Sequence, residues 1–211
     1  MMNESAGEVW ELDRIEGRYG PLVTFDRPAF IHPTAEIYGK NHFAEGSSVW
    51  PRVVMRAENH ENVVGLFSNV QDFVLMHVGL KQGSIVGAHC SIAHHAVLHG
   101  CTIGDNCLIG INATVMDDAV IGDNSIVAGQ SIVVTGTVIP ANSIVAGAPA
   151  KVVKTRNNYV ANRLNAFAYH HNALAYARGD HRAWHGEENR RAIDDEHRRL
   201  EAEFARMRTA E

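Results

Sequence analysis

The chain has 211 residues, of which 45% are hydrophobic and 20% charged, and its net charge is −5 at pH 7. This length and composition suit one globular domain with a sizeable core and exclude a chain that is disordered throughout. The acidic balance excludes the basic surface typical of nucleic-acid-binding proteins, and no apolar run is long enough to span a bilayer.

Residues 1–28 are predicted to form a separate N-terminal segment. They include acidic residues and no apolar stretch of the kind found in secretory signals, so we expect a cytoplasmic protein. The three cysteines contain no CxxC pair, which agrees with a reducing compartment.

Through most of residues 29–155 an aliphatic side chain recurs at every sixth position, and in the clearest stretch only one step differs, being five residues long. The clearest stretch is Val86, Ile92, Leu98, Ile103, Ile109, Val115, Ile121, Val127, Val133, Ile139 and Val145. An upstream series with longer steps comprises Ile31, Ile37, Phe43, Val49, Met55, Val64, Val70 and Met76. A small residue usually follows four positions later, as at Cys90, Ala96, Thr102, Cys107 and Ala113. This period predicts a triangular coil with three short strands in each 18-residue turn, whose like residues stack into one core.

The six-residue period ends near Pro149, and the pattern changes to that of helices. Residues 156–179 are predicted to form a helix that packs on the coil and ends at Gly179. Its apolar stripe is predicted to be Val160, Leu164, Phe167 and Leu174. Residues 180–211 are predicted to form a charged helical extension, either solvated or in contact with a second subunit.

Three of the 13 histidines fall into a pattern that indicates a metal site. Equivalent positions of successive turns lie above one another, so Arg56, His77 and His99 form a column. The two histidines are then roughly 5 Å apart, close enough to share a cation. His94 falls with Asp72 on the preceding face, from which a neighbouring subunit of a trimer would bring it to the other two. Three neutral nitrogen ligands with one open position are typical of a catalytic zinc ion.

The remaining histidines and the cysteines are interpreted as structural. His89 and His95 have no stacked histidine, and His170 and His171 are expected at the surface. Cys90 and Cys107 occupy inward positions of small residues, so we expect them to pack in the core.

The segments SNVQDFVLMH (residues 68–77) and HHAVLHGCTIGDNCLIG (residues 94–110) resemble the γ-class carbonic anhydrases and their hexapeptide-repeat relatives, including the phenylacetate-degradation and carnitine-linked proteins. The resemblance covers about residues 29–155. It implies an all-β fold, a left-handed parallel β-helix, with C-terminal α-helices, in a homotrimer with metal sites between subunits. It also implies that His77, His94 and His99 bind Zn²⁺, or Fe²⁺ or Co²⁺ in its place.

The same resemblance implies that Gln71 lies beside the metal-bound water and that Arg56 and Asp72 form an ion pair between subunits. The chain departs from the family pattern in two places, the acidic residue that follows Arg56 by two positions and the loop of residues 78–85. Where the family usually has Arg-Gly-Asp, this chain has Arg56-Ala57-Glu58, which moves the carboxyl group outward by one methylene. Residues 78–85 contain Lys81 and no acid, whereas the archetypal enzyme has a proton-shuttling glutamate in this loop.

These residues predict a metal-dependent lyase in which a metal-bound hydroxide attacks CO₂ to give bicarbonate. Gln71 would orient the hydroxide, and Arg56 would help to hold the product. Two alternatives stay open: a metal-dependent hydrolase of a small acyl-thioester, and a hexapeptide acyltransferase or non-catalytic scaffold. We expect a small-molecule substrate and neither a nucleic acid nor a membrane as a partner.

Overall fold

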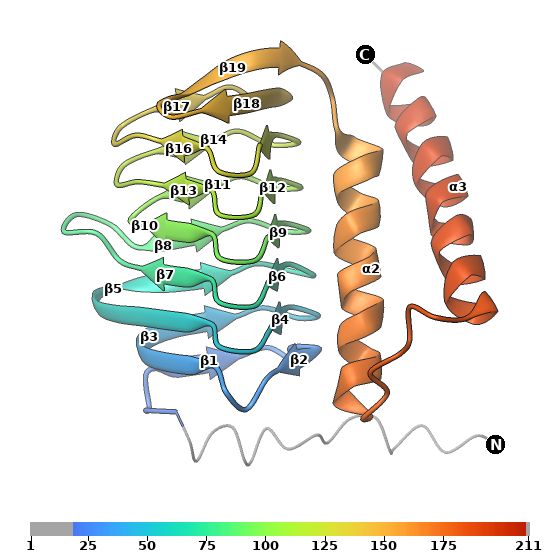
Figure 1. The fold of residues 1–211 in the computed structure, drawn as a ribbon, viewed down its shortest axis with the longest axis horizontal. Helices are drawn as coiled ribbons and strands as arrows, with labels where there is room; N and C mark the ends of the chain where they lie inside the picture. Colours follow the sequence, from blue (N-terminus) through green and yellow to red (C-terminus); the bar gives the residue numbers. More distant parts are fainter. Residues whose placement is uncertain (1–18, 210–211) are drawn as a thin grey trace.

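The computed structural model describes residues 19–209, which form a left-handed parallel β-helix of about seven turns followed by two α-helices (Figure 1). The predicted fold class is therefore confirmed. Most of the predicted N-terminal segment lies outside the described residues.

The coil has three flat faces, which we call A, B and C in the order in which the chain visits them after β2. Face A contains β7 (Leu75–His77), β10 (Val97–His99), β13 (Thr114–Val115) and β16 (Ile132–Val133). Face B contains β1 (Val23–Phe25), β8 (Ser84–Val86), β11 (Thr102–Ile103), β14 (Val120–Ile121) and β17 (Val138–Ile139). Two long strands turn the corner from face A to face B, namely β3 (Glu36–Phe43) and β5 (Val54–Val64).

Face C is a separate eight-stranded sheet. Its parallel strands are β2 (Phe30–Ile31), β4 (Ser48–Val49), β6 (Asn69–Val70), β9 (Ser91–Ile92), β12 (Leu108–Ile109), β15 (Ile126–Val127) and β18 (Ser143–Gly147). The last strand, β19 (Ala150–Thr155), reverses direction and pairs antiparallel with β18.

The six-residue series forms the core of the coil. Every member from Val86 to Val145 is at most 4% exposed, and burial of each such side chain contributes about 1.5–3 kcal/mol. The corners between strands use left-handed backbone conformations, for which Asn and Asp are the best non-glycine residues. Asn106, Asn112 and Asn124 occupy such corners with φ of 55°, 58° and 57°. The period therefore sets both the core and the turns.

One predicted inward position is wrong. Thr102 is only partly buried, and Cys101 takes the inward place with no exposed surface. The five-residue step between Leu98 and Ile103 removes one residue from the corner, where Gly100 has φ of 52°. All three cysteines are buried and unpaired, as the structural interpretation of Cys90 and Cys107 required.

Helix α2 (Tyr159–Ala177) lies along face C, over β2, β4, β6 and β9 (Figure 1). The predicted apolar stripe is wrong, because Leu174 is 38% exposed and the other three members are only partly buried. The fully buried side chains are instead Ala166 and Ala173. The strands beneath α2 present Ser48, Asn69 and Ser91, all buried, and these small side chains let the helix approach closely.

Helix α3 (Glu187–Thr209) packs on α2 of the same chain (Figure 1). Leu200 is fully buried, and Phe204 stacks on Tyr159 of α2 with ring centroids 5.8 Å apart. The Tyr159 hydroxyl also donates to Glu203 at 2.8 Å. The charged extension is thus part of the subunit's own packing. No helix between residues 19 and 209 has the length and apolar character needed to cross a membrane.

Candidate metal centre

The predicted column of face A is present at the corner between faces A and B. Met55 pairs with Met76, and Met76 pairs with Leu98, so the side chains that follow them stack in register. Arg56 is therefore beside His77, and His77 is beside His99. The two imidazole rings have centroids 5.0 Å apart and exposed side-chain fractions of 23% and 32%.

Two ring nitrogens converge at this corner. Nδ1 of His77 lies 3.1 Å from Nε2 of His99. Two nitrogen lone pairs repel each other at this distance, so the two rings must share either a proton or a cation. A tetrahedral ion with metal–nitrogen bonds of about 2.0–2.1 Å holds its ligands about 3.3 Å apart. The pair therefore has nearly the spacing of two ligands on one zinc-like ion.

Each of these histidines has a carboxylate on its other nitrogen. Nδ1 of His99 is 2.9 Å from Asp117, and Nε2 of His77 is 3.1 Å from Glu58. A carboxylate that accepts the second ring N–H fixes the tautomer and turns the first nitrogen towards a metal. Gly79 makes room for this arrangement, because a Cβ on it would lie 2.5 Å from Asp117 Oδ1.

Asp117 was not among the predicted site residues, although the six-residue series could have identified it. Val115 stacks on Leu98, so the corner that follows Val115 lies directly above the corner that contains His99. Asp117 is in that corner, one turn above His99.

Glu58 is exposed and contacts two members of the column, Arg56 and His77. Its carboxylate accepts a hydrogen bond from Arg56 at 2.8 Å as well as contacting His77. Slight desolvation acts to raise the pKa of Glu58, but hydrogen bonds from its backbone and His77, with the charge of Arg56, hold it below its ordinary value. The longer Glu58 side chain thus still reaches the column.

His94 lies at the opposite edge of face A, at the corner between faces C and A. Its Nδ1 is 3.0 Å from Asp72, one turn below, so this histidine is also oriented by a carboxylate. Its Nε2 is 3.4 Å from the hydroxyl of Tyr169 on α2. Burial, and then the charge of Asp72, raise the pKa of Tyr169 to about 12, so the tyrosine is neutral. No spacing in the sequence pointed to this tyrosine, because only the docking of α2 brings it here.

One chain does not complete the site. Within residues 19–209 no three His, Cys, Asp or Glu side chains converge as a metal ion requires. His77 and His99 lie at one corner of face A and His94 at the other, as the sequence predicted. The donor set nevertheless fits a cation of the zinc type, because two neutral nitrogens converge and all three histidines are oriented by carboxylates.

Gln71 lies at the same corner as His94, one turn below it. It is 2% exposed, and its Nε2 donates to Asn69 at 2.9 Å. Asn69 in turn donates to Ser91 at 2.9 Å. This chain of hydrogen bonds fixes the amide of Gln71 and leaves its oxygen as the atom available to a small polar molecule.

Arg56 and Asp72 do not contact each other within the described chain. Arg56 is paired with Glu58, whereas Asp72 is paired with His94 at the other corner. An ion pair between Arg56 and Asp72 therefore needs two subunits, and it stays a prediction.

Two insertions interrupt the coil beside His77. Residues 58–60 form a bulge in β5, and residues 78–83 form a protruding loop between β7 and β8 (Figure 1). They contact each other, because His60 Nε2 is 3.2 Å from the Leu80 carbonyl oxygen. Leu80 is 92% exposed at the tip of the loop, and Lys81 is 3.8 Å from Asp118. The loop thus protrudes beside the histidine column and contains no acidic side chain.

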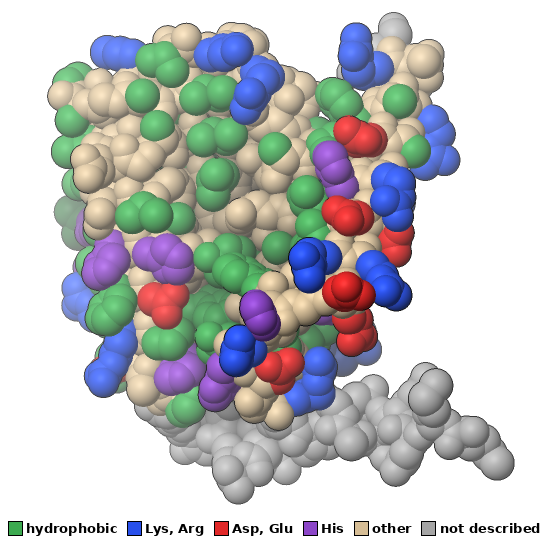
Figure 2. Space-filling model, turned by 45° about the vertical axis from the view of Figure 1, so that its right-hand side comes forward, with side chains coloured by type: hydrophobic (Ala, Val, Ile, Leu, Met, Phe, Trp, Pro, Cys, Tyr) green, Lys and Arg blue, Asp and Glu red, His purple; other side chains and the backbone are tan. Residues whose placement is uncertain are grey.

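The outward surface of face A is mainly apolar. Its in-register column consists of Val54, Leu75, Val97, Thr114 and Ile132. Each of these side chains is at least partly exposed. Figure 2 shows that Lys, Arg, Asp and Glu gather mainly over the α3 side of the molecule, whereas the adjoining wall of the coil has few of them above its histidines.

Among the other histidines, His89 has no stacked histidine, as predicted, and its ring instead stacks on Phe67 at 5.4 Å and lines a cavity. His170, expected at the surface, is partly buried and lies 3.0 Å from the Gly46 carbonyl oxygen. Burial lowers the pKa values of both, that of His89 to about 4. His95 is exposed, as expected, and stacks on Phe73 at 4.9 Å.

A coil of six-residue repeats with inward aliphatic residues defines the hexapeptide-repeat class of proteins. Residues 100–135 match the family model described as bacterial transferase hexapeptide (six repeats). Gamma carbonic anhydrase 1, mitochondrial, of Arabidopsis thaliana is 40% identical over 103 residues, which are 46% of this chain and 37% of that protein. Carnitine operon protein CaiE of Escherichia coli is 37% identical over 91 residues, 43% of this chain and 46% of CaiE. The chain is therefore similar to the hexapeptide-repeat proteins, among them the γ carbonic anhydrases and CaiE.

The matches cover less than half the length of these two relatives. Among solved structures, a hexapeptide transferase family protein from Anaplasma phagocytophilum is 28% identical, with a TM-score of 0.57 over 75% of this chain and 96% of its own. The Bacillus cereus N-acyltransferase AntD, solved with dTDP and coenzyme A, has a TM-score of 0.62 over 80% of this chain and 99% of its own. At 13% identity AntD shows only that the fold is shared.

Proposed function

We propose that this chain forms a homotrimer and catalyses the hydration of CO₂ to bicarbonate at metal centres between subunits. In each centre His77 and His99 of one subunit would bind the ion together with His94 of the partner subunit. The observation that carries the proposal is the convergence of His77 Nδ1 and His99 Nε2 at 3.1 Å, with carboxylates behind all three histidines. The γ carbonic anhydrase relatives support a metal cofactor of this kind.

The ion, whether Zn²⁺, Fe²⁺ or Co²⁺, would supply a Lewis acid that lowers the pKa of water at the site. The chain's own residues would do the rest. Asp117, Asp72 and Glu58 hold the imidazole tautomers, so that each histidine presents a lone pair to the site. The Gln71 amide, fixed by Asn69, would accept a hydrogen bond from the attacking water and orient it.

Arg56 would serve the product or the interface. Its guanidinium is 2.8 Å from Glu58 and its side chain is 47% exposed, so it can turn towards bicarbonate or towards Asp72 of the partner subunit. The loop of residues 78–83 offers no carboxylate for proton export, so we expect buffer molecules to take part in carrying the proton away.

CO₂ hydration measured by stopped-flow on Zn²⁺, Co²⁺ and anaerobically prepared Fe²⁺ protein tests this function. We expect the wild-type protein to bind one equivalent of metal per site and to be active. His99→Ala should lose both the metal and the activity. His95→Asn is the matched control, because His95 is an exposed corner residue that we expect to be dispensable. Absence of hydration in all three metal forms of a correctly assembled trimer would show that the proposed reaction is wrong.

Acyl transfer is a second candidate, favoured by the transferase family model and the transferase-family structure. Release of free thiol from acetyl-CoA distinguishes the possibilities. Thiol release that needs an amine or alcohol acceptor and survives chelation would favour a transferase. Release that occurs without acceptor and stops on chelation would favour a metal-dependent hydrolase of acyl-thioesters.

A further inference from the structure

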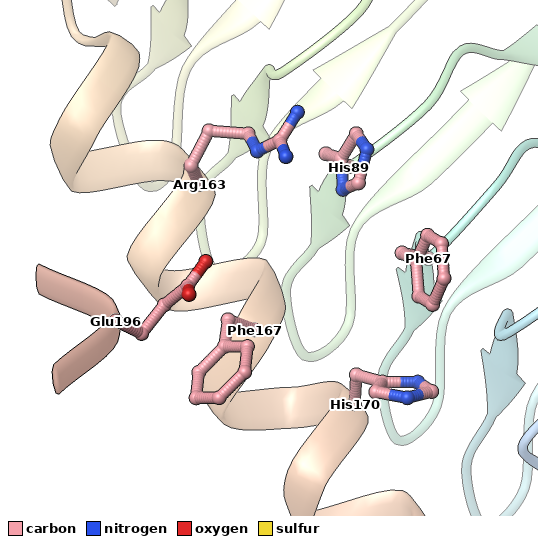
Figure 3. A pocket seen from close by; sticks show the side chains of 6 residues that line it. All are labelled: Phe67, His89, Arg163, Phe167, His170 and Glu196. Carbon is pink, nitrogen blue, oxygen red and sulfur yellow. The ribbon is translucent and has the colours of Figure 1, made fainter. Parts of the chain in front are cut away.

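A cavity of about 320 Å³ lies between the β-helix and its two C-terminal helices, away from the histidines of the proposed metal centre. Figure 3 shows its lining: Phe67 and His89 from corners of the coil, Arg163, Phe167 and His170 from α2, and Glu196 from α3. Its volume is at the lower end of the range of about 300–1,000 Å³ that is typical of small-molecule sites.

Four of the six lining side chains are planar rings. Phe67 is parallel to His89, with centroids 5.4 Å apart and an interplanar angle of 8°. His170 meets Phe67 edge to face at 4.9 Å and 82°. Ring faces that are fixed in this way favour a flat aromatic ligand, which stacks on them with little loss of conformational freedom.

The charges of the cavity favour an anion with a single negative charge. Arg163 extends from α2 towards His89 (Figure 3), and in the described part of the chain it forms no ion pair with a carboxylate. Glu196 is already neutralised by Arg199, through hydrogen bonds of 2.7 and 2.6 Å. Both histidines are neutral because burial lowers their pKa values. A dianion such as a phosphate ester would keep one negative charge without a partner in the cavity, whereas the charge of one carboxylate is matched by Arg163 alone.

We propose that this cavity is a second binding site, which takes a small aromatic monocarboxylate with its ring against Phe67, His89 and Phe167 and its carboxylate on Arg163. The site lies within one subunit and uses none of the residues of the proposed metal centre. It therefore stands or falls independently of the CO₂ hydration proposal.

Benzoate is the probe, titrated into the chelator-treated full-length protein by calorimetry and followed by imidazole ¹H–¹⁵N spectra. We expect saturable binding with shifts at His89 and His170, and a Kd that rises about tenfold or more in Arg163→Gln because a charge-assisted hydrogen-bonded pair is lost. Arg178→Gln, at an exposed arginine on the end of α2, is the matched control and should leave the Kd unchanged. Benzamide tests the charge, and cyclohexanecarboxylate tests the flat ring; both should bind several-fold more weakly.

Phe167→Leu gives a second test that keeps all the charges, and we expect it to weaken benzoate more than it weakens cyclohexanecarboxylate. Circular dichroism identifies any variant that fails to fold. The proposal is overturned if no saturable binding occurs at millimolar benzoate, if Arg163→Gln binds like the wild type, or if benzamide binds as well as benzoate.

Discussion

His99 has a different partner on each side of its ring, His77 on Nε2 and Asp117 on Nδ1. The contact with His77 defines the proposed pair of metal ligands. The contact with Asp117 fixes the orientation of the His99 ring. At the residue scale, the site therefore depends on carboxylates as much as on histidines. The sequence only partly revealed these carboxylates, because the search was for histidines that bind the metal and not for the residues that orient them.

Asp117→Asn tests this support. An amide cannot accept the ring N–H of His99 as strongly as a carboxylate, so we expect metal affinity to fall by about 10–100-fold while the fold is kept. Zinc affinity measured by competition with a chromophoric chelator gives the comparison. Asp118→Asn is the matched control, since Asp118 is the next residue and faces Lys81 instead. Equal affinities for both variants would rule out a role for Asp117 in orienting His99.

His89 predicts a pH dependence of stability. Burial, together with the charge of Arg163, lowers its pKa to about 4 from an ordinary 6.5. Between pH 4 and pH 6.5 the His89 side chain binds a proton in the unfolded chain but not in the folded one. Protonation therefore does not oppose folding above pH 6.5, and the free energy of unfolding decreases as the pH falls from 6.5 towards 4. The ring is only partly buried, so we expect a loss on the order of 1 kcal/mol.

His89→Asn should remove this loss, because Asn tolerates the φ of 55° at this corner and does not titrate. Urea unfolding at pH 7 and pH 4.5 gives the two free energies for each protein. His95→Asn, at a corner with φ of 60° but exposed, should keep the pH dependence of the wild type. A His89→Asn protein with the same pH dependence as the wild type would contradict the assignment.

At the scale of elements, the position of α2 is set by small side chains. The helix period was visible in the sequence, but the buried face was not, because an isolated stripe of Leu, Val and Phe does not show which surface the helix meets. Face C presents Ser48, Asn69 and Ser91 to the helix, and a close approach to such a flat surface selects alanines. Asn162 then donates to two carbonyl oxygens of the coil, those of Asn106 and Ser125.

Ala173→Leu tests this packing. Ala173 is fully buried in a cluster with Phe30 and Trp50, so a larger side chain there should lower the free energy of unfolding by about 1–3 kcal/mol. Ala161→Leu, at an exposed position of the same helix, should have little effect. Urea denaturation of the two variants gives the comparison, and equal stabilities would show that α2 does not pack tightly at Ala173.

At the scale of the whole molecule, the coil could be predicted from the sequence almost completely, because one period determines core, turns and stacking together. Only a local irregularity was missed, the exchange of Thr102 for Cys101 at the shortened corner. The proposed site was predicted less fully for a different reason. His94 and the pair of His77 and His99 lie at opposite edges of one face, and no property of a single chain brings them together.

The apolar column of face A predicts where subunits meet. Ile132 is 40% exposed on this face and lies in the same column as Val97, two turns above it, so Ile132→Glu should dissociate the trimer without touching a ligand. We expect metal binding to be lost at the same time. Val138→Glu, at a position 69% exposed on face B, should leave both unchanged. Light scattering with metal analysis measures the two properties, and a monomer that still binds metal tightly would refute a site shared between subunits.

The reversed strand β19 has a consequence for the end of the coil. A stack of parallel strands has no natural last member, and its final edge offers unpaired backbone groups to another copy, which is how fibres grow. On face C this edge is occupied by β19, which runs against the direction of the stack and carries Lys151 and Lys154. A second molecule that continued the stack would have to pair with a strand that runs antiparallel to the others and carries lysines. Lateral assembly is thereby left open, whereas growth along the axis of the coil is opposed.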